Sequence, residues 1–173
     1  MLQFDTVLLR ALEDSDLDFL YALENDPAIW AVSDTLAPVS RFTLRQYLAN
    51  ASADFHEVRQ LRLIICSTVN ERAVGALDLF NFEPLHQRAG VGITVLASER
   101  RRGYAQAALT LLLDYAGRHL RLHQLYCTIA ASNEASLTLF QAAGFQYVGI
   151  RREWLRTASG WQDAMEMQYI IKI

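Results

Sequence analysis

The sequence predicts an α/β protein of the α+β kind, with a mixed, mostly antiparallel sheet of six to seven strands and helices on both faces. Three observations support this prediction. Three strand-like segments follow one another between residues 61 and 96, which is typical of an antiparallel meander. A helix-like segment at 103–118 leads into an almost wholly apolar strand at 125–130, which indicates a central strand. Because strands alternate with single helices after residue 96, helices should cover both faces of the sheet.

The first 60 residues are expected to contain one strand and two helices. Residues 7–10 form a short apolar strand, and Asp14 is a good N-cap for a helix that Pro27 interrupts. Residues 28–39 are expected to form a loop or a broken helix. Ser40 caps a second helix. The apolar residues of that helix recur at i, i+3, i+4 and i+7: Leu44, Tyr47, Leu48 and Ala51.

The meander consists of strands at 61–67, 74–82 and 88–96. The third strand contains Gly90 and Gly92. Glycines within a strand often mark a bulge or a close approach to the backbone by another group.

The remaining elements alternate between helix and strand. A helix starts at Gly103, and after the strand at 125–130 a short helix begins at Asn133 and stops at Gly144. The chain closes with an antiparallel pair of strands, joined by a long connection that holds Gly160: residues 145–150 and 164–171.

Length and composition predict a single soluble domain spanning residues 1–173. The net charge of -3 does not favour nucleic acid, and the absence of an 18-residue apolar run argues against a membrane helix. The start of the chain lacks the features of a secretory signal. Cys66 and Cys127 lie in apolar runs and cannot form a multi-ligand metal site of the usual kind. They fit a reducing cytoplasm, so we expect a cytoplasmic protein without a metal.

The segment 100–105, Arg-Arg-Arg-Gly-Tyr-Ala, lies between a glycine-containing strand and the start of a helix. Backbone N–H groups at such a junction have no partner within the helix, and the helix dipole adds positive potential. This combination suits a phosphate or pyrophosphate, and Gly103 lets the ligand approach the backbone. The alternative is a solvated arginine surface. The segment lacks the glycines of a dinucleotide-binding fingerprint and the Gly-Lys pair of a P-loop.

The same segment resembles the acetyl-CoA motif of the GCN5-related N-acetyltransferases, Arg/Gln-x-x-Gly-x-Gly/Ala, with Arg100, Gly103 and Ala105 at its fixed positions. Residues 133–145 resemble the Asn-x-x-Ser/Ala…Gly-Phe signature of that family. Two further segments, near the two ends of the chain, resemble the family: residues 9–17 and 160–167. The nearest branch holds the ribosomal-protein alanine N-acetyltransferases and the spermidine N-acetyltransferases.

The resemblance implies that acetyl-CoA is the cofactor and coenzyme A the product. It implies a pyrophosphate site formed by six consecutive residues: Arg100, Arg101, Arg102, Gly103, Tyr104 and Ala105. It implies a site for the pantetheine arm and thioester formed by two further groups of residues: Ile93, Thr94 and Val95 on the strand, and Asn133, Ser136 and Phe140 on the helix. A bulge at 93–95 would splay this strand from 128–130, and the N–H near Val95 would face the thioester carbonyl oxygen. Asn133 also reads as a plain N-cap, and both roles can hold together.

The catalytic residues are less well defined, because this chain departs from the family pattern at two positions. Many members carry a tyrosine as general acid where this chain has Phe140, and Ser136 is the nearest matched alternative. Many carry a glutamate where this chain has Gly90, and Asp78 on the neighbouring strand is a candidate replacement base. The alternative for Asp78 is an aspartate paired with an arginine, and for Ser136 an exposed residue of the first helical turn.

The sequence therefore predicts an N-acetyltransferase that transfers acetyl directly from the CoA thioester to a primary amine. The acceptor can be a protein N-terminus, a polyamine or a small amine. A polyamine requires several carboxylates, and the candidates are Glu24, Asp26, Asp34 and Asp78. The alternative function is a CoA-binding module with little catalysis. The final strands and the segment holding Trp154 and Trp161 could pair with a second subunit, so a homodimer is possible.

Overall fold

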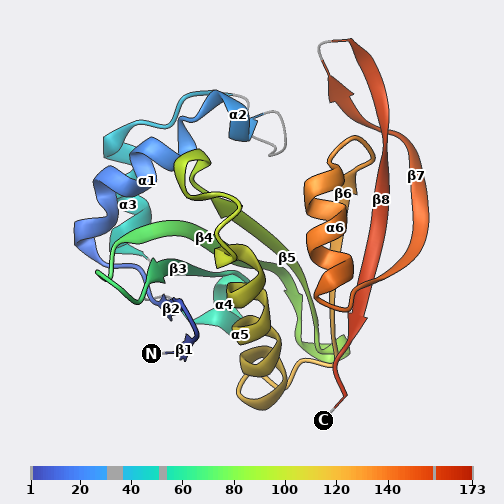
Figure 1. The fold of residues 1–173 in the computed structure, drawn as a ribbon, viewed down its shortest axis with the longest axis horizontal. Coiled ribbons are helices and arrows are strands. Elements are labelled where there is room, and N and C mark those ends of the chain that lie inside the picture. The colour runs from blue at the N-terminus through green and yellow to red at the C-terminus, as the bar shows by residue number, and fades with distance from the viewer. Residues whose placement is uncertain (1, 31–36, 51–53, 158, 173) are drawn as a thin grey trace.

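The computed structural model of the protein describes residues 2–30, 37–50, 54–157 and 159–172. Its strands form one mixed sheet in the order β1-β2-β3-β4-β5-β6-β8-β7, in which only β5 and β6 are parallel (Figure 1). The strands are β1 Leu2–Phe4, β2 Val7–Arg10, β3 Leu61–Ser67, β4 Ala73–Glu83, β5 Arg88–Val95, β6 Gln124–Ala130, β7 Gln146–Thr157 and β8 Gly160–Ile170. The predicted fold class is confirmed, but the predicted count of six to seven strands is too low, because β1 is too short to show a strand pattern.

Helices cover both faces of this sheet, as predicted. The α-helices are α1 Leu17–Glu24, α2 Pro27–Trp30, α3 Arg41–Ala49, α4 Phe55–Val58, α5 Tyr104–Arg118 and α6 Glu134–Ala142. The described residues also contain three 3-10 helices in the connections: η1 Asp14–Asp16, η2 Pro84–His86 and η3 Ala97–Glu99. Alternate side chains of one strand enter different cores: Leu9 packs in the cluster that contains α5, whereas Leu8 packs with Leu20 of α1 and Leu44 of α3. No helix among the described residues is long and apolar enough to cross a membrane.

The start of α1 differs from the prediction. Asp14 does not cap this helix but begins η1, which Glu13 caps, and α1 starts only at Leu17. The buried Asp16 accepts two hydrogen bonds of 2.7 Å from the Arg10 guanidinium and one of 2.8 Å from the Glu13 N–H. Burial by itself would raise the pKa of Asp16, but these hydrogen bonds and the charge of Arg10 lower it. Asp16 is therefore ionised, and it fixes the end of β2 against the start of α1.

Other local predictions have mixed outcomes. Pro27 does interrupt α1, but it also begins the short helix α2. Ser40 caps α3, because its Oγ accepts from the Thr43 N–H at 3.1 Å. Ala51 and part of the predicted loop at 28–39 lie outside the described residues. The helix α4 was not predicted, since four residues are too few to show a helical period.

The last two strands are much longer than the predicted segments 145–150 and 164–171. They form a hairpin, and Gly160 belongs to the start of β8 rather than to a long connection. Most of β7 is exposed on both faces, so its sequence has no alternating pattern of buried residues. The β7–β8 register also shifts twice, with Glu153 at φ +45°, and such irregularities are invisible in a strand pattern.

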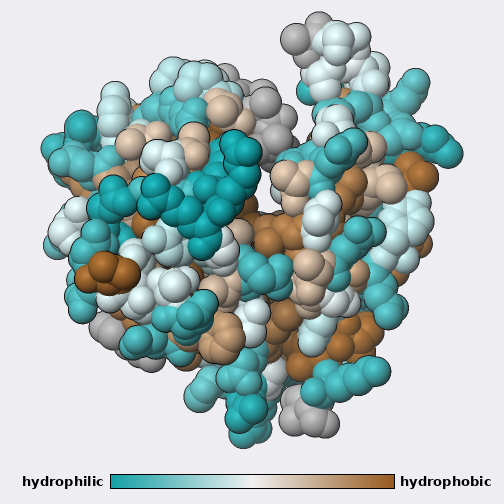
Figure 2. Space-filling model, viewed as in Figure 1, coloured by the Kyte–Doolittle hydropathy of each residue, from teal (hydrophilic) through white to brown (hydrophobic). Residues whose placement is uncertain are grey.

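The strands β5 and β6 pair over three positions only and then part. Their ladder runs from Arg88 opposite Gln124 to Gly90 opposite Tyr126. The predicted separation from 128–130 is confirmed, and Figure 2 shows a hollow between the two halves of the molecule. The predicted bulge at 93–95 is wrong, because β5 stays in continuous register with β4 up to Val95. The irregularity lies instead between Phe80 and Glu83.

Candidate active site

The segment before α5 has the backbone of an anion site. Arg101 and Gly103 have left-handed backbones, with φ of +61° and +82°, and Gly103 is the N-cap of this 15-residue helix. The N–H groups of the first turn have no partner within the helix, and the dipole of α5 adds to their positive potential. A Cβ added to Gly103 would meet nothing within 4 Å, so space for a ligand lies beside the backbone. Tyr104 and Ala105, the first two residues of α5, pack against the core cluster that contains α5, which we call the main core.

The three arginines of this segment do not act as equivalent free cations. The Arg100 Nε donates to the Val95 carbonyl at 3.1 Å, which ties the segment to the end of β5. Arg102 Nη1 lies 3.2 Å from Oε2 of Glu99, and Arg72 pairs with the other oxygen of that carboxylate. Glu99 is only 4% exposed and was not singled out in the sequence, where an acid before an arginine run looks solvated. The predicted anion site therefore lies next to a buried carboxylate that is held between two arginines.

No strand of the described residues pairs with the β6-facing edge of β5 beyond Gly90, so this edge at residues 93–95 could accept a ligand along the hollow. Across it lies the start of α6. The Asn133 side chain accepts from the Ser136 N–H at 3.2 Å, which confirms its N-cap role. The Ser136 side chain is half-buried, and its hydroxyl has no hydrogen-bond partner within the described ranges. This leaves the hydroxyl free to meet a ligand.

Phe140 lies deeper than the sequence suggested. Its side chain is 3% exposed and meets Phe145 edge-to-face at 5.0 Å between ring centroids. The ring belongs to the main core, where it contacts other apolar side chains. Its contact with a cofactor stays a prediction.

The sheet face opposite α5 carries Asp78, one of the carboxylates predicted to meet the acceptor, and we call it the acceptor face. Leu77 and Leu79 of β4 point into the core that contains α5, so Asp78 and Phe80 point to the acceptor face. A Cβ added to Gly90 would lie 2.3 Å from the Phe80 ring. The close approach predicted for this glycine is therefore a neighbouring aromatic side chain, and a glutamate does not fit there unless Phe80 moves.

Asp78 is held by an arginine that the sequence analysis did not single out. Arg62 of β3 donates from Nε and Nη2 to the two oxygens of Asp78, at 2.7 and 3.0 Å, and from Nη1 to Glu24 at the end of α1. The paired alternative for Asp78 is thus the observed arrangement. The sequence gives no sign of this pair, because Arg62 and Asp78 are far apart in sequence and become neighbours only as opposite residues of the β3–β4 ladder.

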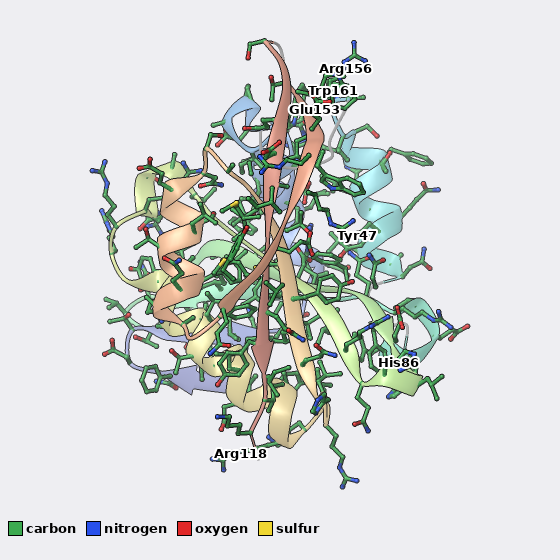
Figure 3. The ribbon with its side chains drawn as sticks, turned by 90° about the vertical axis from the view of Figure 1, so that its right-hand side faces the viewer. Tyr47, His86, Arg118, Glu153, Arg156 and Trp161 are labelled. Atoms are coloured by element: carbon green, nitrogen blue, oxygen red, sulfur yellow. The ribbon has the colours of Figure 1, made fainter. Side chains whose placement is uncertain are left out.

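The other acceptor-side candidates are also engaged in local contacts. The Glu24 backbone carbonyl accepts from the Trp30 Nε1 at 2.7 Å, and the Asp26 side chain accepts from the Ala28 N–H at 2.9 Å. Asp34 lies outside the described residues. Figure 3 shows Tyr47 of α3 on one side of the molecule, and His86 lies below it on η2, between β4 and β5.

Comparison with known families agrees with this geometry. A family model described as "Acetyltransferase (GNAT) domain" matches residues 6–146. The spermidine N(1)-acetyltransferase of Vibrio cholerae is 26% identical over 164 residues, which cover 95% of this chain and 92% of that protein. The spermidine N(1)-acetyltransferase of Escherichia coli K12 is 26% identical over 148 residues, which cover 83% of this chain and 75% of that protein.

Solved structures show the same fold. A spermidine N-acetyltransferase from Vibrio cholerae, in complex with CoA and spermine, superposes with a TM-score of 0.87 at 23% identity. The match covers 96% of each chain. A dodecameric structure of spermidine N-acetyltransferase from the same organism gives a TM-score of 0.80 at 24% identity, covering 95% of this chain and 94% of that one.

Proposed function

This chain belongs to the GNAT acetyltransferase family and is an acetyl-CoA-dependent N-acetyltransferase, and we propose that it acts by direct transfer to a primary amine. The observation that carries the proposal is the parting of β5 and β6 beyond Gly90, beside the anion site at Gly103. This arrangement offers one ligand a charged site at α5 and an open strand edge along the hollow. Bound acetyl-CoA supplies the acetyl group as a thioester.

Two features of the described residues favour direct transfer over a covalent acetyl-enzyme. Burial, with a smaller contribution from the charge of Glu166, raises the pKa of the Cys127 thiol to about 12. A thiol with so high a pKa is a poor nucleophile at neutral pH. Cys66 is also buried, and burial raises its pKa as well. Neither cysteine is therefore suited to carry the acetyl group.

We assign the residues of the cofactor side as follows. The N–H groups around Gly103 bind the pyrophosphate, and the open edge of residues 93–95 binds the pantetheine arm and presents an N–H to the thioester carbonyl. The Ser136 hydroxyl hydrogen-bonds the sulfur that leaves. As the new N–C bond forms, the C–S bond breaks; the amine loses one proton and the departing thiolate takes one up, so the products are the amide and the free CoA thiol. Asp78 is a weak candidate for accepting this proton, because both of its oxygens already accept from Arg62. Holding amine and thioester together then contributes most of the rate.

An acetyl-CoA turnover assay with free thiol as the readout tests this function. The panel contains spermidine, a peptide with a free N-terminus and small monoamines, and CoA binding is measured separately by calorimetry. We expect thiol release that depends on an acceptor. CoA binding without such release would favour the alternative, a CoA-binding module with little catalysis.

Replacing Ser136 by alanine is expected to lower kcat by about tenfold, because the leaving sulfur loses a hydrogen-bond donor but no general acid. The affinity for CoA should change little, since the Ser136 N–H still donates to Asn133. Steady-state kinetics and calorimetry check the two expectations. Thr138→Ala, an exposed change on the same helix, is the matched control. Unchanged kcat in Ser136→Ala would remove Ser136 from the mechanism.

We propose that the protein forms a homodimer through the β7 edge. Within the part of the chain that the structure describes, this strand pairs only with β8, and no strand covers its other edge. Several large apolar side chains of the hairpin are exposed: Tyr147, Val148, Ile150, Trp154 and Trp161. Figure 3 shows Trp161 at the far end of the hairpin. An open, apolar edge strand favours pairing with a second copy.

The dimer predicts a solution mass of about twice the 19.6 kDa of one chain, measured by light scattering. Val148→Glu with Trp154→Glu should shift the protein to the monomer, because two charges then face the partner copy. The exposed Val69, in the β3–β4 turn, gives the control Val69→Glu. A monomeric wild-type protein would contradict the proposal.

The two buried, free cysteines fit a reducing compartment, so we propose that this one acetyltransferase domain works in the cytoplasm.

A further inference from the structure

Aromatic side chains line the acceptor face where β5 and β6 begin to part. The Phe80 ring lies across the β5 glycines: a Cβ on Gly90 would be 2.3 Å from its Cε2, and one on Gly92 would be 3.7 Å from its Cε1. Tyr126 pairs with Gly90 and meets Phe80 edge-to-face at 6.5 Å between centroids. Both rings are half-buried, so part of each remains accessible. The two glycines therefore make room for a flat apolar surface beside the thioester site.

The carboxylates on the β4 side of this surface are already paired. Arg62 binds both oxygens of Asp78 and one oxygen of Glu24, and the three side chains are only 17%, 20% and 21% exposed respectively. Burial by itself would lower the pKa of Arg62, but the carboxylates of Asp78 and Glu24 raise it above its usual value, so the guanidinium stays charged. Burial raises the pKa of the Tyr47 hydroxyl, which stays neutral. This cluster therefore has one net negative charge rather than two free carboxylates.

The carboxylates on the opposite side also have local partners, although Glu166 accepts through only one of its two oxygens. Glu166 of β8 accepts from the Thr128 Oγ1 at 2.6 Å and from the Arg151 Nε at 2.7 Å. Asp163 accepts from Arg152 at 2.8 Å. Asp26, at the end of α1, serves as the cap of α2. Among the described residues near the hollow, each of these acids thus has an arginine or backbone partner.

A polyamine brings several ammonium groups, and each needs a carboxylate that is free to pair with it. An ammonium group that leaves water without such a partner loses more free energy of hydration than it gains from its contacts with the protein. A flat apolar body instead gains by packing against the Phe80 and Tyr126 rings, which favour edge or offset contacts with another ring.

We propose that the acceptor is a primary monoamine with a flat apolar body, an arylalkylamine, and that Phe80 and Arg62 determine this preference. The inference rests on the proposed function and narrows its acceptor. Phe80 supplies the packing surface, and Arg62 occupies the carboxylates that a second ammonium group would need.

Three acceptors with the wild-type protein test the proposal: 2-phenylethylamine, butylamine as an aliphatic monoamine, and spermidine. At saturating acetyl-CoA, kcat/KM for 2-phenylethylamine should exceed that for each of the others by about tenfold or more, the discrimination expected of an apolar pocket. Preference for spermidine would overturn the inference and leave the proposed function intact. Equal use of butylamine would overturn the role of the aromatic surface. No thiol release with any amine would overturn the proposed function itself.

Two variants test whether Phe80 and Arg62 determine which acceptor the protein prefers. Phe80→Leu keeps apolar volume but loses the flat ring, so it should reduce the advantage of 2-phenylethylamine over butylamine by about tenfold without changing the CoA affinity. Phe42→Leu, an exposed change on α3, is the matched control. Arg62→Met frees Glu24 and Asp78 and should raise kcat/KM for spermidine relative to 2-phenylethylamine. If Arg62→Met does not fold, the wild-type ranking and Phe80→Leu decide the question.

Discussion

Replacing Gly103 by leucine is expected to weaken CoA binding by about 100-fold, or about 2.7 kcal/mol. The leucine side chain would enter the open space beside Gly103, where nothing lies within 4 Å of an added Cβ. This is the space that we assign to the pyrophosphate, so the side chain would displace the ligand from the N–H groups of α5. Calorimetric titration with CoA measures the effect.

The same substitution should cost little stability. A non-glycine residue at φ +82° costs about 1–2 kcal/mol, and no packed neighbour is displaced. Gly103→Ala separates the two effects, because it carries the same backbone strain with little bulk. We expect both variants to lose similar stability in urea unfolding, and the leucine variant to lose far more CoA affinity. A folded Gly103→Leu protein with unchanged CoA affinity would show that the anion site lies elsewhere.

The backbone geometry of the segments that we assign to the cofactor was predictable because its sequence signals are local. The Arg100–Ala105 segment and the Asn133 cap each act within a few residues, so their backbone geometry follows from residue types at short spacing. The N-cap hydrogen bond of Asn133 and the left-handed Gly103 both appear in the structure.

The acceptor side was harder to predict because its contacts cross the sheet. Phe80 fills the space beside Gly90, and Arg62 binds Asp78, only because of the β3–β4–β5 register. A sequence shows which residues of one strand share a face, but it does not fix which residue of the next strand lies opposite. The position of the bulge was wrong for the same reason. It was predicted in β5, whereas the register shifts in β4 after Phe80.

The burial of charged residues was the other source of error. Glu99 and Asp16 each lie in polar segments of the sequence, where acids are usually solvated. Each is buried beside an arginine contributed by another segment: Arg72 for Glu99, and Arg10 for Asp16. Such pairs depend on tertiary contacts, so residue type alone gives no indication of them.

Replacing Gly75 by alanine is expected to lower the free energy of unfolding by about 3 kcal/mol, the upper end of the usual cost of overpacking. An added Cβ would lie 2.4 Å from the Thr94 carbonyl oxygen and 3.2 Å from the Val95 Cα. Both are backbone atoms of β5, so no side-chain rotation relieves the clash, and the two strands must move apart. Urea unfolding followed by circular dichroism measures the loss.

Gly92→Ala is the matched control, because its added Cβ would have only an ordinary contact, at 3.7 Å from the Phe80 ring. We expect this variant to lose less than about 1 kcal/mol. Gly75→Ala should also weaken CoA binding in the fraction that folds, since the clash displaces the open β5 edge at residues 93–95 that we assign to the pantetheine arm. Equal stability of the two variants would contradict the close β4–β5 approach. Loss of stability without loss of CoA affinity would instead place the pantetheine arm away from this edge.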